Sequence, residues 1–315
     1  MPRLNRFCCA LTFWALLLPI VLPAQEDPVF RADTRLVVLH ASVVDRKGRL
    51  VTNLPQGAFK VFENGVEQQI RVFRREDVPV SMGLVVDNSG SMRDKRQKVE
   101  AAALQLVKAS NRQDQVFIVN FNDEAFLDTP FTNDIKKLEE GLARIDSRGG
   151  TAMRDAISMS IDYVKEAAKK DKKILLVVTD GNDNTSSITL EKLVQKAQQS
   201  EVLIYTIGLL DEEERREAKR AKRAMDALTV ASGGLPYYPK ELVEVEQIAL
   251  QVAHEIRNQY ILAYTPTNEA LDGSFRQIRV TVDGPGRPVV RTRTGYYATP
   301  EAAGRTAAAR PGMAQ

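Results

Sequence analysis

The chain has 315 residues, enough for one large domain or for a medium-sized domain beside a smaller one. Its content of 43% hydrophobic and 27% charged residues is ordinary for a globular protein. The net charge of +3 is too small to indicate a protein that binds nucleic acid.

The first residues differ from the rest of the chain. Arg3 and Arg6 precede an apolar run over residues 7–22, and the small residue Ala24 follows two positions later. A basic region, an apolar region and a small residue in this order predict an export signal over residues 1–24. The protein is then expected in the periplasm, in the cell envelope or outside the cell. The apolar run is short for a membrane span, and an uncleaved anchor is the alternative.

Both cysteines of the chain, Cys8 and Cys9, lie inside this predicted signal. Cleavage would therefore leave a protein with no disulfide and no thiol chemistry. Removing residues 1–24 also takes away two arginines and no acidic residue, so the net charge would fall to about +1.

Residues 30–78 are predicted to form β strands. Valine and leucine are frequent in residues 35–45, and residues 58–65 alternate between apolar and polar. The Asn64-Gly65 pair that ends this alternation predicts a hairpin turn into the next strand, residues 67–76.

Strands and helices alternate over residues 80–258. The expected strands are residues 81–87, 114–121, 172–181 and 202–208, and the expected helices are residues 93–110, 133–145, 149–170, 189–199, 211–231 and 241–258. Asn133 is the expected N-cap of the second helix. Because the strands are apolar throughout and alternate with helices, the sequence predicts an α/β fold with a mostly parallel sheet covered on both faces.

The chain returns to strand patterns over residues 259–299, which resemble residues 30–78 in character. We expect the two flanks to join into one β domain with the α/β block inserted between them, although two separate small sheets would give the same pattern. Residues 300–315 are low in complexity and are expected to be a disordered tail.

Five oxygen-bearing residues mark a candidate metal site. Asp87 and Asp180 end two of the apolar strands, where ligands bind in open parallel sheets. Ser89 and Ser91 alternate with Asp87 along the chain, and Thr151 follows two glycines. A set of two carboxylates and three hydroxyls suits a hard dication such as Mg²⁺ or Mn²⁺ and disfavours zinc. Such a metal would keep a position open for a carboxylate of another molecule.

Three motifs around these residues resemble the von Willebrand factor type A family. The stretch "DNSGSM" at residues 87–92 matches the family's metal-ion-dependent adhesion site motif, "GGTAMRDAI" its threonine loop and "VVTDG" its distal aspartate. The three motifs occur in the family's order, and the resemblance covers residues 80–258. It implies a doubly wound, Rossmann-like sheet with one short antiparallel edge strand.

The resemblance also implies a function and a role for each site residue. Ser89 and Ser91 would bind the metal directly, Thr151 or Asp180 directly or through water, and Asp87 often through water. The metal would be Mg²⁺, or else Mn²⁺ or Ca²⁺. The implied protein is not an enzyme: it binds a protein partner that presents Asp or Glu, and it meets a membrane only if the signal stays uncleaved.

The flanking segments carry a narrower resemblance, to exported bacterial proteins called von Willebrand factor A-related. Residues 43–73 before the block and residues 255–268, 274–280 and 291–298 after it carry this likeness. It bears on architecture more than on the role of the protein.

Two other functions stay open. One is a structural module of the envelope whose metal site is vestigial. The other is a magnesium-dependent phosphoester hydrolase. The sequence offers little for the hydrolase, because no second acid stands two residues after Asp87, and no glycine-rich loop with a lysine is present.

Several other polar residues have simpler interpretations. Asn122 and Asp123 are expected in a plain turn, with a place near the site as the alternative. Asp183, Asn184 and Ser186 either shape the rim of the site or belong to a helix entry. His40 and His254 have no partner that suggests catalysis. The charged run over residues 211–223 is expected to be a solvated helix.

Overall fold

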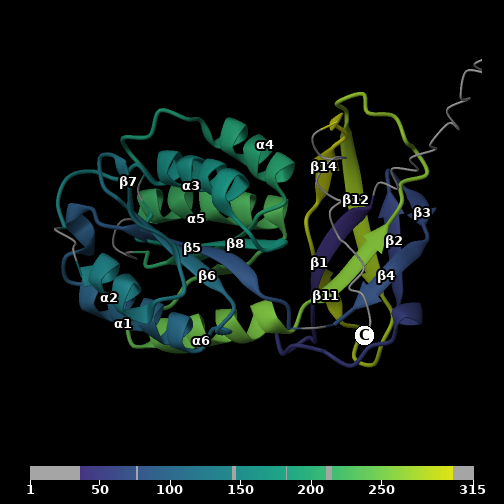
Figure 1. The fold of residues 1–315 in the computed structure, drawn as a ribbon, viewed down its shortest axis with the longest axis horizontal. Coiled ribbons are helices and arrows are strands. Elements are labelled where there is room, and N and C mark those ends of the chain that lie inside the picture. The colour runs from purple at the N-terminus through teal and green to yellow at the C-terminus, as the bar shows by residue number, and fades with distance from the viewer. Residues whose placement is uncertain (1–35, 76, 144–146, 182, 211–214, 301–315) are drawn as a thin grey trace, which may run out of the picture. The chain divides into compact units, whose positions relative to one another are not determined.

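A computed structural model describes residues 36–75, 77–143, 147–181, 183–210 and 215–300 (Figure 1). All of them belong to one compact unit, Thr34–Gln315. The predicted signal, residues 1–24, and the predicted tail from residue 301 onward lie outside the described residues. Within the described ranges no helix is both long enough and apolar enough to cross a bilayer.

A six-stranded sheet forms the centre of the α/β part, as far as the structure describes it. Its strand order is β10-β9-β8-β5-β6-β7, and β7 is the antiparallel member at one edge. The strands are β5 (Val80–Asp87), β6 (Gln115–Phe121), β7 (Ala125–Thr132), β8 (Lys172–Thr179), β9 (Leu203–Gly208) and β10 (Pro236–Tyr237). Every residue of β5 is buried because strands pair with it on both sides and helices cover both faces.

Helices cover both faces of this sheet (Figure 1). On one face lie α1 (Arg96–Lys108), α2 (Ile135–Ala143) and α6 (Glu244–Arg257); on the other lie α3 (Met153–Ala167), α4 (Leu190–Ser200) and α5 (Arg215–Ser232). Alternate residues of the strands contribute to the two cores: Leu84 faces α1 and α6, and Val85 faces α3. The burial of both faces explains the continuous apolar runs in the sequence.

The flanking strands form two four-stranded antiparallel sheets in the described part of the chain, ordered β13-β1-β11-β4 and β14-β12-β2-β3. Their strands are β1 (Val37–Val44), β2 (Phe59–Glu63), β3 (Val66–Gln68), β4 (Ile70–Arg74), β11 (Tyr260–Tyr264), β12 (Phe275–Val282), β13 (Val289–Arg291) and β14 (Gly295–Tyr297). Strands from before and after the α/β block alternate in the first sheet, and in the second sheet β12 from after the block pairs with β2 from before it. The inner faces of the two sheets share one apolar core. The predicted fold class, an α/β sheet with a β domain drawn from both flanks, is confirmed.

Local details refine the sequence-based predictions. Asn64 and Gly65 have φ of 48° and 84°, the left-handed values that a two-residue hairpin turn requires. The single strand expected over residues 67–76 is wrong: it divides into β3 and β4, which belong to different sheets. The N-cap expected at Asn133 is also wrong, because Asp134 Oδ1 accepts the N–H of Lys136 at 3.0 Å where α2 begins.

Two short 3-10 helices, η1 (Gln56–Ala58) and η2 (Gly90–Met92), complete the described elements. The second of these is part of the candidate site, because it follows the end of β5 and contains Ser91.

A buried carboxylate connects the flanking strands to the α/β part. Glu255 of α6 is 3% exposed. Its Oε1 accepts hydrogen bonds from Ser42 of β1 at 2.8 Å and from Tyr205 of β9 at 3.3 Å, and its Oε2 accepts one from Tyr237 at 2.9 Å. Burial raises the pKa of Glu255, although the three hydroxyl donors oppose that rise.

This raised pKa predicts a pH-dependent stability. A carboxyl whose folded pKa is raised stabilises the fold most below its unfolded pKa, about 4.3, and loses that contribution as the pH rises through the folded pKa. We therefore expect Glu255→Gln to cost less stability at pH 8 than at pH 4.5, measured by urea unfolding. Glu241→Gln, at an exposed position before α6, is the control and should show equal effects at both pH values. An equal cost of Glu255→Gln at both pH values would contradict the prediction.

Candidate metal centre

Asp87 ends the central strand β5 and is 3% exposed. Its Oδ2 accepts the hydroxyl of Thr179 at 2.6 Å, and its Oδ1 accepts the backbone N–H of Ser89 at 2.9 Å. Thr179 ends β8, the neighbour of β5, so this hydrogen bond joins the carboxyl ends of two strands from which the chain continues in opposite directions across the sheet. Asp87 thus lies at the topological switch point, where open parallel sheets bind ligands.

Burial raises the pKa of the Asp87 carboxyl to about 6. The hydrogen bonds from Thr179 and Ser89 oppose that rise, and the negative charge of Asp180 adds to it. A second carboxylate thus acts on Asp87 across the same switch point.

Ser89 and Ser91 lie in and beside η2 directly after the strand. Ser89 is 1% exposed, whereas Ser91 is exposed to solvent. Their hydroxyl oxygens are 3.2 Å apart. The extended backbone of Ser89 (φ −65°, ψ 167°) turns the chain so that both hydroxyls point to the same side.

The Thr151 loop is held against the end of β5 by its neighbours. Gly90 donates its N–H to the carbonyl of Gly149 at 3.2 Å, and Asp123 accepts the N–H of Gly150 at 2.8 Å. Gly149 has φ of +76°, and a Cβ there would lie 2.0 Å from the Asp123 carboxylate. Gly149 is therefore required by a close approach and by left-handed backbone, and a Cβ at Gly150 would lie 2.8 Å from Asn184 Oδ1.

Thr151 is itself 4% exposed and is paired with the loop after β8. Its N–H donates to Asn184 Oδ1 at 2.9 Å, and its carbonyl accepts the N–H of Asn184 at 3.1 Å. Asp183 Oδ2 accepts the N–H of Arg154, in the first turn of α3, at 2.7 Å. The loop that carries Asp180 and the loop that carries Thr151 are thus bound to each other.

Asp180 is paired with a lysine. Lys95 Nζ lies 3.0 Å from Asp180 Oδ2, and the two side chains are 24% and 8% exposed. A carboxylate with so little solvent contact needs a compensating charge, and in this structure Lys95 supplies it.

One cavity of about 540 Å³ brings these residues together. It is lined by Ser89, Ser91, Asp94, Lys95, Gly149, Gly150, Thr151, Asp180, Asn184, Glu217 and Ala218. Four of the five predicted site residues line this cavity, and Asp87 lies behind Ser89, with which it shares a hydrogen bond.

The donor set fits a hard dication. Neighbouring ligands of octahedral Mg²⁺, at bonds of about 2.1 Å, are about 3.0 Å apart, close to the 3.2 Å between the hydroxyl oxygens of Ser89 and Ser91. The described residues contain no group of three or more His, Cys, Asp or Glu that could hold a metal. A site with two carboxylates and three hydroxyls has too few of those residues to form such a group, so its fit rests on the hydroxyls.

Sequence reasoning weighed two of the residues that support the site and missed a third. Asp123, for which the sequence favours a plain turn over a place near the site, holds Gly150 through its carboxylate. Asn184, expected either to shape the rim or to lie at a helix entry, lines the cavity and anchors Thr151. Lys95 lies eight residues after Asp87, and nothing in its local pattern points to a partner 85 residues away.

Comparison with known proteins identifies the class. Residues 82–182 match the family model of the von Willebrand factor type A domain. The chain therefore contains a von Willebrand factor type A domain, as its three motifs predict. This family is one of protein–protein interaction and adhesion domains.

Individual relatives match parts of the chain. Integrin alpha-11 of Mus musculus is 30% identical over 110 residues, which are 33% of this chain and 9% of the relative. Calcium-activated chloride channel regulator 1 of Mus musculus is 26% identical over 172 residues, 51% of this chain and 17% of the relative. Each match thus spans less than a fifth of the relative's own length.

One solved structure extends the likeness beyond the domain. A structure described as von Willebrand factor type A from Catenulispora acidiphila superposes with a TM-score of 0.51 at 12% identity, covering 84% of this chain and 75% of the other. At that identity the likeness concerns the fold.

The hydrogen bond between Thr179 and Asp87 predicts a measurable cost. Thr179→Val keeps the shape of the side chain but removes the donor to the buried carboxylate of Asp87 and the acceptor of the Gly181 N–H. We therefore expect a loss of about 1.5–3 kcal/mol in unfolding free energy at pH 8, mostly from the bond to the carboxylate. Thr206→Val is the matched control: Thr206 is equally buried on β9, and its hydroxyl oxygen has no hydrogen-bond partner within the described residues. Equal costs for the two variants would refute the interpretation.

Proposed function

We propose that the protein is an exported, non-enzymatic binding protein that holds a divalent cation at Asp87, Ser89, Ser91, Thr151 and Asp180. The cation, Mg²⁺ or else Mn²⁺ or Ca²⁺, would supply a Lewis-acidic position that accepts an Asp or Glu side chain of a protein partner. The observation that supports this most is the gathering of four of these side chains around one solvent-accessible cavity at the switch point.

The roles of the residues follow from their surroundings. Ser91 is the exposed hydroxyl and Ser89 the buried one, and the pair would offer two neighbouring oxygens to the metal. Asp87 is held by Thr179 and Ser89 and acts on the site from behind Ser89. Asp180 lies at the cavity wall and would release Lys95 or share its charge with the cation.

One observation favours the alternative of a structural module with a vestigial metal site. Lys95 already provides a positive charge beside Asp180, which lowers the need for a metal. The two functions differ in whether Mg²⁺ binds, so metal titration separates them. The hydrolase alternative has no comparable observation in its favour.

Ser91→Ala tests the metal centre with little risk to folding, because Ser91 is exposed. We expect Mg²⁺ to raise the midpoint of thermal unfolding of the wild-type protein and to give a calorimetric binding signal. Ser91→Ala should weaken binding at least tenfold, whereas Ser274→Ala, at an exposed serine before β12, should leave it unchanged. No Mg²⁺, Mn²⁺ or Ca²⁺ binding by the wild type would favour the structural module.

Lys95→Met tests the electrostatics of the same site. Removing a positive charge next to Asp180 removes a repulsion on the bound dication, so Mg²⁺ affinity should rise at least threefold. Lys98→Met, which removes an exposed lysine one turn further along α1, is the control. Unchanged or weaker Mg²⁺ binding by Lys95→Met would show that Lys95 and the cation do not compete for Asp180.

The partner-binding step has its own readout. Proteins captured from envelope extract in Mg²⁺ should be lost in EDTA and with the Ser91→Ala variant as bait. Capture that survives both changes would argue against a metal bridge, even if the metal itself binds.

A further inference from the structure

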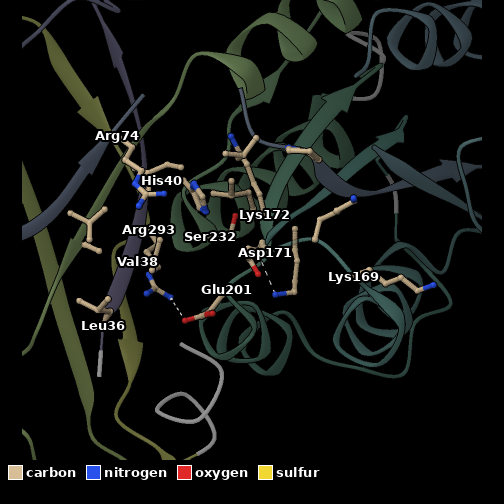
Figure 2. Close-up of a pocket in the computed structure, with 18 residues that line it drawn as sticks. Leu36, Val38, His40, Arg74, Lys169, Asp171, Lys172, Glu201, Ser232 and Arg293 are labelled. Carbon is tan, nitrogen blue, oxygen red and sulfur yellow. Dashed lines mark hydrogen bonds and ion pairs between the residues drawn. The ribbon is translucent and has the colours of Figure 1, made fainter. Parts of the chain in front are cut away.

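A second cavity, drawn in Figure 2, lies beside the amino ends of two strands of the central sheet. Its volume is about 470 Å³, within the range of sites for small organic ligands. Lys172 and Leu203, at the amino ends of β8 and β9, contribute to its wall. The metal-site residues follow the carboxyl ends of the strands, so the two cavities are separated by the length of the sheet.

The floor of this cavity is the second face of the sheet β13-β1-β11-β4. One face of that sheet forms the core of the flanking strands, with Leu39 and Leu262 fully buried. The other face carries an apolar row across three strands: Val38 pairs with Ala263, which pairs with Val72. All three line the cavity. They form a strip of aliphatic side chains that runs from the edge strand β4 across β11 to β1, and an apolar ligand could lie on it.

The next row of the same face carries nitrogen-bearing side chains. His40 pairs with Ile261, which pairs with Arg74. Arg293 stands two residues beyond Arg291, which pairs with Ser42 in the antiparallel register, so Arg293 comes level with His40. Figure 2 shows His40, Arg74 and Arg293 around the same part of the cavity.

Two of these side chains have buried nitrogens with no hydrogen-bond partner in the described part of the chain: His40 Nδ1 and Arg293 Nε. Arg293 is 7% exposed, and its one ion-pair contact shown by the structure is Glu201, at 3.7 Å from Nη1. A buried donor without a partner is costly, so a ligand that accepts hydrogen bonds here would gain affinity.

The electrostatic surroundings favour an anion. The cavity wall carries Arg74, Lys169, Lys170, Lys172, Lys173 and Arg293 against Asp171 and Glu201. Burial and then the charges of Lys172, Arg293 and Lys173 lower the pKa of His40 well below 6.5, so His40 is neutral and can donate one hydrogen bond. Burial likewise lowers the pKa of Lys172 to about 7, and the arginines keep their charge at any physiological pH.

We propose that this cavity binds a small organic anion with an apolar body, such as a free medium-chain or aromatic carboxylate. The anionic head lies against His40, Arg293 and Arg74, and the body lies on the strip of Val38, Ala263 and Val72. The site is independent of the metal centre, because no residue lines both cavities.

The test uses the fluorescent anion 1-anilinonaphthalene-8-sulfonate and N-phenyl-1-naphthylamine, which has the same rings without the sulfonate. The purified protein should bind the anion at least tenfold more tightly than the neutral analogue, and decanoate should displace it. Arg74→Gln should weaken binding of the anion at least fivefold, and Val72→Trp should abolish binding of both dyes by filling the strip. Arg71→Gln, on the same strand but outside the cavity, is the matched control.

The outcomes separate this proposal from simpler explanations. Equal affinity for the two dyes, or an unchanged affinity in Arg74→Gln, would overturn it. The unfolding midpoint of each variant excludes dye binding to a disordered protein, and Arg74→Gln keeps the test valid if Val72→Trp fails to fold, because Arg74 is exposed. A titration with phosphatidylglycerol vesicles distinguishes a free ligand from a lipid: cosedimentation that Arg74→Gln abolishes would place the ligand in a bilayer and overturn the proposal of a free anion.

Discussion

The hydrogen bond between Thr179 and Asp87 is the interaction on which the candidate site depends. It joins the ends of two adjacent parallel strands across the switch point, at 2.6 Å and out of contact with solvent. A carboxylate in this position would be unfavourable without such donors. Because Asp87 also accepts the N–H of Ser89, the same residue sets the direction in which the chain leaves the strand. The positions of Ser89 and Ser91 follow from it.

The loop of Thr151 and the loops that follow β6 and β8 then complete the cavity, because the first is hydrogen-bonded to the other two. The Thr151 loop is bound on one side to Asp123 and on the other to Asn184, so its approach to the site is determined by residues from two other strand ends. Such support matters because a metal ligand must be held in place by neighbours that do not touch the metal. Lys95 adds a charge that balances Asp180, and a dication would have to compete with it.

The flanking strands do more than extend the domain. Glu255 connects β1 to the α/β part through hydroxyl donors from both, and one sheet of the flanking strands presents an apolar strip and a row of basic side chains to a cavity. The two ends of the central sheet therefore have different chemistry. The carboxyl ends of the strands carry oxygen donors, whereas the amino ends adjoin an apolar cavity with basic groups.

The sequence by itself determined the alternation of strands and helices, the burial of β5 and the residues of the candidate site. These follow from local patterns: apolar runs, helical periodicity and polar residues directly after a strand. Only the tertiary structure decided the rest. The strands β3 and β4 belong to different sheets, because β4 pairs with the distant strand β11. Two contacts at the site also join residues far apart in the chain: the pairing of Lys95 with Asp180, and the support of the Thr151 loop by Asp123. Such contacts depend on how whole elements pack, and no local pattern of residue types encodes a partner at that distance.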